Sequence, residues 1–176
     1  KKEFELGLIR NHYVGRTFIE PAQNIRSLGV KLKLSSTKSI VKNKSIILID
    51  DSLVRGTTCH KIVKMLYESG AKEVHVRIAC PEIKYPDFYG VDMPTKEELL
   101  AHKKNNQEMC DYIKAKSLKF LSLDGMYKAL IGSKRNSNYP QFSDHYFTGD
   151  YPIKPSDNLN GLKIKQLSLL SSKSNS

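Results

Sequence analysis

One segment of this chain of 176 residues constrains its fold more than any other. The short run Ser45–Ile49 is almost wholly apolar and β-branched, and two aspartates, Asp50 and Asp51, follow it directly. A continuous run of this kind predicts a strand buried on both faces, as in a parallel sheet. After a polar turn, apolar residues recur at helical spacing from His60 to Glu68, with Gly70 placed to end the helix. The segment therefore predicts a strand, a turn and a helix in that order.

The chain after this segment continues the alternation. A second strand is predicted from Glu73 to Cys80, stopped by Pro81, and a third from Leu118 to Leu123. Strands that alternate with helices predict an α/β fold with a parallel sheet and right-handed crossovers.

Three further helices are expected from local signals. Thr95 and Glu98 have the spacing of a capping box, which predicts a helix that runs through Leu100. Met109–Ile113 has helical periodicity, and Asp124 is expected to cap a last helix, Gly125–Leu130.

Composition narrows the classes of protein that this chain can be. No apolar run approaches the roughly 20 residues that a membrane span requires, and the mean hydropathy is −0.45. The three cysteines have no Cys-x-x-Cys spacing, which favours reduced thiols in a cytoplasmic protein over a zinc site. The formal charge of +11 is compatible with a polyanionic ligand or with a solvated, lysine-rich surface.

The aspartate pair and the turn after it, Ser52-Leu-Val-Arg-Gly-Thr-Thr58, carry the chemical signal. In open α/β sheets, ligands bind beyond the carboxyl ends of the strands, and the start of a helix offers free backbone N–H groups to a phosphate. Ser52, Thr57 and Thr58 add hydroxyl donors. Carboxylates accept hydrogen bonds from a ribose diol and hold Mg²⁺. The alternative is an ordinary turn in which Thr57 or Thr58 caps the helix; Cys59, next in the chain, is either an activated thiol or a small core residue.

These residues resemble the phosphoribosyl-pyrophosphate (PRPP) signature of type I phosphoribosyltransferases. Three further stretches, Leu6–Ile19, Val30–Ser35 and Pro81–Pro94, resemble the carboxyl-terminal half of glutamine PRPP amidotransferases. The resemblance implies that the chain has the type I phosphoribosyltransferase fold, truncated at its N-terminus. The composition changes after Gly132 and is of low complexity at the end, so we expect a partial phosphoribosyltransferase domain at 1–132, an extension at 133–170 that packs on it, and a disordered tail at 171–176.

The resemblance also assigns roles to residues. Asp50 and Asp51 would hold the ribose hydroxyls and Mg²⁺, while Ser52, Arg55, Gly56, Thr57 and Thr58 would bind the 5-phosphate of PRPP. A lid at residues 10–18 would close over PRPP and contribute the catalytic side chains Arg10, Tyr13 and Arg16. For Arg10 and Arg16, the residues alone leave a solubilising surface role equally open.

The activity that the resemblance implies is the first step of purine synthesis, in which ammonia displaces pyrophosphate from PRPP and 5-phosphoribosylamine forms. Ammonia would come from a glutaminase domain that this chain lacks, purine nucleotides would inhibit, and the full-length enzyme would be a homo-oligomer in the cytoplasm. No iron–sulfur cluster, nucleic acid or membrane is expected. Two other functions stay open: a non-catalytic module that binds PRPP or nucleic acid, and an inactive truncated remnant.

Overall fold

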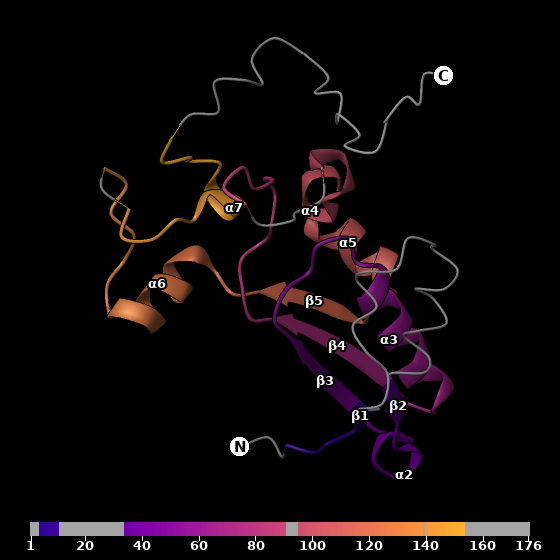
Figure 1. Cartoon of the computed structure of the whole chain (residues 1–176). Coiled ribbons are helices and arrows are strands. Elements are labelled where there is room, and N and C mark those ends of the chain that lie inside the picture. Colours follow the sequence, from indigo (N-terminus) through magenta and orange to yellow (C-terminus); the bar gives the residue numbers. More distant parts are fainter. Residues whose placement is uncertain (1–3, 11–33, 91–94, 139, 154–176) are drawn as a thin grey trace, which may run out of the picture.

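The computed structural model of this chain describes residues 4–10, 34–90, 95–138 and 140–153 (Figure 1). Its centre is a parallel sheet with the strand order β3-β4-β5. The strands are β3 (Ser45–Asp50), β4 (Glu73–Ile78) and β5 (Ser117–Phe120). Ile46 pairs with Val74, and Val76 pairs with Leu118. The prediction of an α/β fold with a parallel sheet is thus confirmed, although the third strand ends at Phe120 and not at Leu123.

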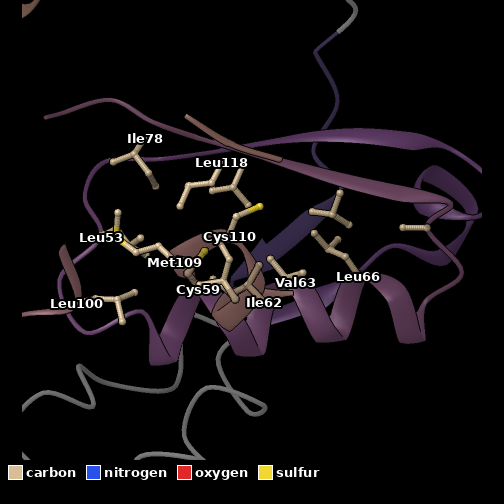
Figure 2. Packing of buried hydrophobic residues seen from close by; sticks show 14 of the residues in the cluster. Leu53, Cys59, Ile62, Val63, Leu66, Ile78, Leu100, Met109, Cys110 and Leu118 are labelled. Atoms are coloured by element: carbon tan, nitrogen blue, oxygen red, sulfur yellow. The ribbon is translucent and has the colours of Figure 1, made fainter. Parts of the chain in front are cut away.

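Two helices, α3 (Thr57–Glu68) and α5 (Asn106–Ile113), cover one face of this sheet. Figure 2 shows the core between them and the strands, where Val63 of α3 and Met109 of α5 are fully buried. Val76 of β4 and Ile113 of α5, also fully buried, belong to the same core. Side chains alternate between the two faces of a strand, so every second residue of β3 and β4 contributes to this core.

The exposure of the opposite face of the sheet contradicts the prediction that β3 is buried on both faces. Ile47 and Ile49 of β3 are 46% and 69% exposed, so this strand is not buried on both faces. The helices that pack on the sheet in the described part of the chain lie on the other side. On β4, the corresponding positions are His75 and Arg77, which are half-buried and lie within hydrogen-bond distance of the Ser117 hydroxyl at 2.8 and 3.0 Å.

A two-stranded antiparallel sheet lies near the amino ends of the large sheet. It consists of β1 (Leu8–Arg10) and β2 (Leu34–Ser36), and the short helix α2 (Lys38–Val41) follows it. Val41 anchors α2 because its side chain is buried in the main core.

The helix starts differ from the predictions in three places. Thr95 caps no α-helix: residues Lys96–Glu98 form a single 3₁₀ turn, η2, and α4 (Leu100–Lys103) follows separately. The capping box lies further on, where Asn105 and Glu108 exchange hydrogen bonds of 3.0 and 2.8 Å at the start of α5. The asparagine is as good a cap as threonine, and it directly precedes the amphipathic segment that packs in the core.

The last long helix, α6 (Leu123–Ile131), also has a different cap from the one expected. The Ser122 hydroxyl accepts a hydrogen bond from the Gly125 N–H at 3.0 Å, and Asp124 lies inside the first turn. An acidic residue there is favourable because of the helix dipole, even without a capping role.

A carboxyl-terminal clasp, residues 143–153 with the short helix α7 (His145–Thr148), packs against the loop at 84–90. The Lys84 and Tyr85 amides both donate to the Tyr146 carbonyl, at 2.9 and 3.1 Å. His145 is 1% exposed, and its Nε2 lies 2.8 Å from Asp87 Oδ1. The aromatic residues of this stretch therefore pack on the protein.

A buried ion pair ties the clasp to α6. Asp144, 2% exposed, accepts hydrogen bonds from Arg135 Nε at 2.5 Å and from the Tyr127 hydroxyl at 2.7 Å. Arg135 also donates to Asp150 at 2.7 Å. Burial alone would raise the pKa of Asp144, but the hydrogen bonds from Arg135 and Tyr127 outweigh it and hold this pKa below its ordinary value.

Candidate functional site

The candidate site lies at the carboxyl edge of the parallel sheet, where the strand arrows of Figure 1 point. β3 ends at Asp50, and a loop of residues 51–56 leads into α3. The Ala79 amide donates to the Asp50 carbonyl at 2.9 Å, which joins the ends of β3 and β4. The backbone that presents the aspartate pair is therefore fixed by the sheet.

The two carboxylates face an exposed surface. Asp50 Oδ1 accepts a hydrogen bond from the Asp51 N–H at 3.1 Å, and Asp51 Oδ1 accepts one from the Ser52 hydroxyl at 2.9 Å. Partial burial raises the pKa of Asp50, and the charge of Asp51 adds to the rise while the hydrogen bond from the Asp51 amide opposes it. A second negative charge beside a partly buried carboxylate is unfavourable, so this pair gains from a nearby cation or from hydroxyl donors.

The start of α3 provides hydrogen-bond donors. Gly56 occupies the N-cap position with φ = 75°, a conformation in which glycine has no steric penalty. A glycine has no side chain to cap the first-turn amides, and α3 has no side-chain cap at this position. The N–H groups of the first turn, together with the Thr57 and Thr58 hydroxyls, are suited to an anionic ligand.

Neighbouring segments pack against the loop at residues 51–56. The Leu100 amide donates to the Val54 carbonyl at 2.9 Å, and a Cβ on Gly56 would lie 2.6 Å from Leu100 Cδ2 and 3.0 Å from Tyr112 Cε1. Leu53 is 3% exposed and belongs to the core. Close packing behind Gly56 thus requires a residue without a side chain.

Arg55 lies in an ion pair. Its Nη2 and Nε donate to the two carboxylate oxygens of Glu98, at 3.1 and 3.4 Å. Both side chains are about half exposed, at 44% and 50%. Sequence reasoning missed this partner because the spacing of Thr95 and Glu98 favours a capping box, and only the fold brings η2 beside the loop.

The cysteines near the site are not activated. Cys59 is 2% exposed, and burial together with the charge of Asp50 raises the pKa of its thiol to about 12. Burial likewise raises the pKa of Cys80 to about 11. Of the two explanations for Cys59, the structure supports the small core residue.

The structure brings together seven of the predicted site residues and leaves the others untested. Arg10 ends β1, whereas Tyr13, Arg16 and most of the predicted lid at 10–18 lie outside the described residues. These seven residues lie at the end of β3, in the loop after it and in the first turn of α3: Asp50, Asp51, Ser52, Arg55, Gly56, Thr57 and Thr58.

The acidic pair lies on an open surface of the described protein. A cavity of about 500 Å³ lies further along the same edge, lined by Pro81, Lys119 and Ser122 among others, but not by Asp50 or Asp51. The described residues contain no cluster of three or more His, Cys, Asp or Glu side chains able to hold a metal. They also contain no helix of the length and apolarity that a membrane span needs.

Mg²⁺ fits the carboxylate pair chemically. The half-buried Asp50 and the exposed Asp51 offer the oxygen ligands that Mg²⁺ prefers, and the ion commonly completes its shell with water and substrate phosphates. Partial burial is the main cause of the raised pKa of Asp50, and the charge of Asp51, which a divalent cation would offset, adds to it.

A search of solved structures identifies the class of protein. A glutamine PRPP amidotransferase from B. subtilis, solved with ADP and GMP, matches with a TM-score of 0.71 and 48% identity over 84% of this chain and 32% of its own. A structure described as the allosteric regulatory enzyme of purine biosynthesis has the same TM-score over 85% of this chain. The parallel sheet and strand-end aspartates thus define a type I phosphoribosyltransferase fold, as the sequence predicts.

Curated relatives narrow the class to one family. An amidophosphoribosyltransferase of Rhizobium etli is 54% identical over 170 residues, which is 96% of this chain and 34% of the relative. The Staphylococcus aureus enzyme is 52% identical over 85% of this chain, and the chloroplastic amidophosphoribosyltransferase 1 of Arabidopsis thaliana is 50% identical over 93%. No model of a protein family matches. The chain is similar to amidophosphoribosyltransferases over about a third of their length, which confirms the resemblance.

Proposed function

We propose that this chain provides the PRPP site of an amidophosphoribosyltransferase. The observation that carries the proposal is the placement of Asp50 and Asp51 beside the uncapped start of α3, at the carboxyl end of a parallel strand. The similarity to relatives of that name supports it. The reaction is attack of ammonia on the anomeric carbon of PRPP, with cleavage of the bond to pyrophosphate and loss of one proton from nitrogen.

Different groups of described residues bind different parts of the substrate. The Asp50 and Asp51 carboxylates accept hydrogen bonds from the ribose hydroxyls. The first-turn amides of α3 and the hydroxyls of Ser52, Thr57 and Thr58 bind the 5-phosphate. Mg²⁺ held at the carboxylate pair would supply positive charge to the departing pyrophosphate. The protein's task is positioning and electrostatic stabilisation, so no covalent nucleophile is required.

Other parts of the proposal depend on the relatives. Arg10, Tyr13 and Arg16 are proposed to act from a lid at 10–18, and ammonia to come from a glutaminase domain. Purine nucleotides are proposed as inhibitors because a similar enzyme was crystallised with ADP and GMP. A homo-oligomeric full-length enzyme is proposed as well. Three free cysteines are consistent with a cytoplasmic location.

Titration of PRPP with Mg²⁺ into the chain, followed by calorimetry, tests the proposal. Asp51→Asn removes one carboxylate from the ribose site, and we expect affinity to fall by about ten- to a hundredfold, since a hydrogen bond to a charged group contributes roughly 1.5–3 kcal/mol. Asp124→Asn, which removes an exposed carboxylate on α6, is the matched control and should bind as the original chain does.

Two results would contradict the proposal. One is equal PRPP affinity in Asp51→Asn and Asp124→Asn, and the other is a folded chain that binds no PRPP. Binding of a short oligonucleotide in place of PRPP would favour the alternative of a nucleic-acid module.

A further inference from the structure

The segment 95–100, called the strap below, lies against the loop at residues 52–58, to which the proposed function assigns the 5-phosphate. It contacts this loop at three successive residues. Glu98 accepts both hydrogen bonds from the Arg55 guanidinium, at 3.1 and 3.4 Å. Two residues later, the Leu100 amide donates to the Val54 carbonyl at 2.9 Å. The Leu100 side chain, 7% exposed, then packs beside Gly56. The strap thus contacts Val54, Arg55 and Gly56 one after another.

The pairing with Glu98 decides what the Arg55 side chain does. Both carboxylate oxygens of Glu98 lie within hydrogen-bond distance of the guanidinium, a two-point arrangement that fixes the plane of the group as well as its position. The same residue contributes its backbone to the loop that leads into α3. A side chain fixed on the strap therefore restricts the backbone of this loop.

We propose that Glu98 is a positioning residue for the phosphate site: by holding Arg55 on the strap, it keeps the loop at residues 52–58 in the shape that receives the 5-phosphate. The proposal deepens the proposed function and depends on it for the identity of the ligand. It assigns Arg55 to the support of the loop, and leaves phosphate binding to the first-turn amides and the hydroxyls.

A simple electrostatic role for Glu98 predicts the opposite effect. A carboxylate near a phosphate site repels the ligand and competes with it for Arg55, so its neutralisation would strengthen phosphate binding. A positioning role predicts weaker binding once the acid is neutralised, because the loop loses its support. The direction of the change in affinity therefore separates the two roles.

Neutralising Glu98 is compatible with a folded chain. Pairs as exposed as Arg55 and Glu98 contribute little to global stability, since solvent screens them. Glu97 provides a matched control, because it is the next residue on the same 3₁₀ turn and its carboxylate interacts with Thr95 and its own backbone amide. Glu98→Gln and Glu97→Gln remove the same charge from neighbouring positions.

Two measurements on the 176-residue chain test the proposal. Calorimetry with ribose 5-phosphate should show about three- to fivefold weaker binding for Glu98→Gln than for Glu97→Gln, the fold-change that corresponds to the loss of one exposed ion pair. Amide hydrogen exchange without ligand should be faster across residues 52–58 in Glu98→Gln only. Equal or tighter binding by Glu98→Gln, or unchanged exchange in this loop, would overturn the proposal.

A double-substitution cycle shows whether Glu98 acts through Arg55. We expect Arg55→Met and Glu98→Gln each to weaken binding, and the double variant to bind no more weakly than the single variants. Additive losses would refute the positioning role. If the original chain binds neither ribose 5-phosphate nor PRPP, the proposed function fails, while the exchange measurement still decides the role of Glu98.

Discussion

The strand-end segment at residues 50–58 and the carboxyl-terminal clasp use the same kinds of residues in different ways. Asp50 and Asp51 lie at the open edge of the sheet, where Asp50 accepts a hydrogen bond from the Asp51 amide and Asp51 accepts one from the Ser52 hydroxyl. In the clasp, Asp144 is buried and accepts hydrogen bonds from both Arg135 and Tyr127. Carboxylates satisfied by protein donors stabilise the fold, whereas carboxylates left at a strand end are available to a ligand.

The comparison gives a rule for assigning function to acidic residues in this chain. Burial with complete pairing indicates a structural role, and partial burial beside a like charge indicates a binding role. The pKa values reflect the difference, because that of Asp50 is raised and that of Asp144 is lowered.

The largest stability effect is expected from the clasp. Among the described residues, Asp144→Asn leaves the largely buried Arg135 side chain with only the exposed Asp150 as a charged partner, and we expect a loss of about 3 kcal/mol, since removal of one member of a buried ion pair leaves a poorly compensated charge. Urea unfolding measures the change. Asp150→Asn, which removes the exposed partner of the same arginine, should cost under about 1 kcal/mol; equal losses would show that burial does not distinguish the two carboxylates.

A substitution in the loop should affect binding as well as stability. Gly56→Ala adds a Cβ 2.6 Å from Leu100 at φ = 75°, and we expect a loss of about 2 kcal/mol together with weaker PRPP binding. Gly132→Ala is the control, because Gly132 has φ = 72° but open space around it. It should show the smaller cost of the backbone conformation, about 1 kcal/mol, and normal binding. Identical behaviour of the two variants would contradict the close packing behind Gly56.

From the sequence alone, most of the loop at the strand end could be predicted but little of the clasp. Asp50, Asp51 and the turn to Thr58 are contiguous, so local rules for strand ends and helix starts suffice to predict their placement. The contacts of Glu98 with Arg55 and of Asp144 with Arg135 involve side chains brought together by the fold. The sequence spacing of such residues carries no signal that distinguishes them from other charged surface residues.

The difference between local signals and contacts made by the fold also explains why some helix starts were predicted wrongly. Thr95-Lys-Glu-Glu98 and Asn105-Asn-Gln-Glu108 both fit the pattern of a cap followed by an acid three residues later. The residues buried after the second pattern, Met109, Cys110 and Ile113, have helical spacing, whereas those buried after the first, Leu99, Leu100 and Ala101, are consecutive. Tertiary packing therefore decided which of two equivalent local signals forms an α-helix.

Removal of one hydrogen bond from the clasp should have a smaller effect than removal of its charge. Tyr127→Phe keeps the buried ring but removes the donor to Asp144, and we expect a loss of about 1.5 kcal/mol, as is usual for a hydrogen bond to a charged group. Tyr112→Phe, on the partly exposed ring beside Gly56, should change the unfolding free energy by under about 0.5 kcal/mol. A loss in Tyr127→Phe as small as in the control would mean that the remaining donors, Arg135 and Thr148, satisfy Asp144 without it.

Acid neutralises Asp144 without changing the shape of its side chain. Because the folded pKa of Asp144 is lowered, its contribution to stability is complete above the pKa of the unfolded chain, about 3.9, and is lost as the pH falls through the folded value. Urea unfolding at successive pH values should show the difference in stability between the original chain and Asp144→Asn shrinking below about pH 4. Ser122→Ala, which removes an uncharged cap of α6, should differ from the original chain by a constant amount over the same range. If the Asp144→Asn difference stays equally constant, the carboxylate charge in the clasp does not stabilise the fold, and the contrast with the strand-end aspartates is not electrostatic.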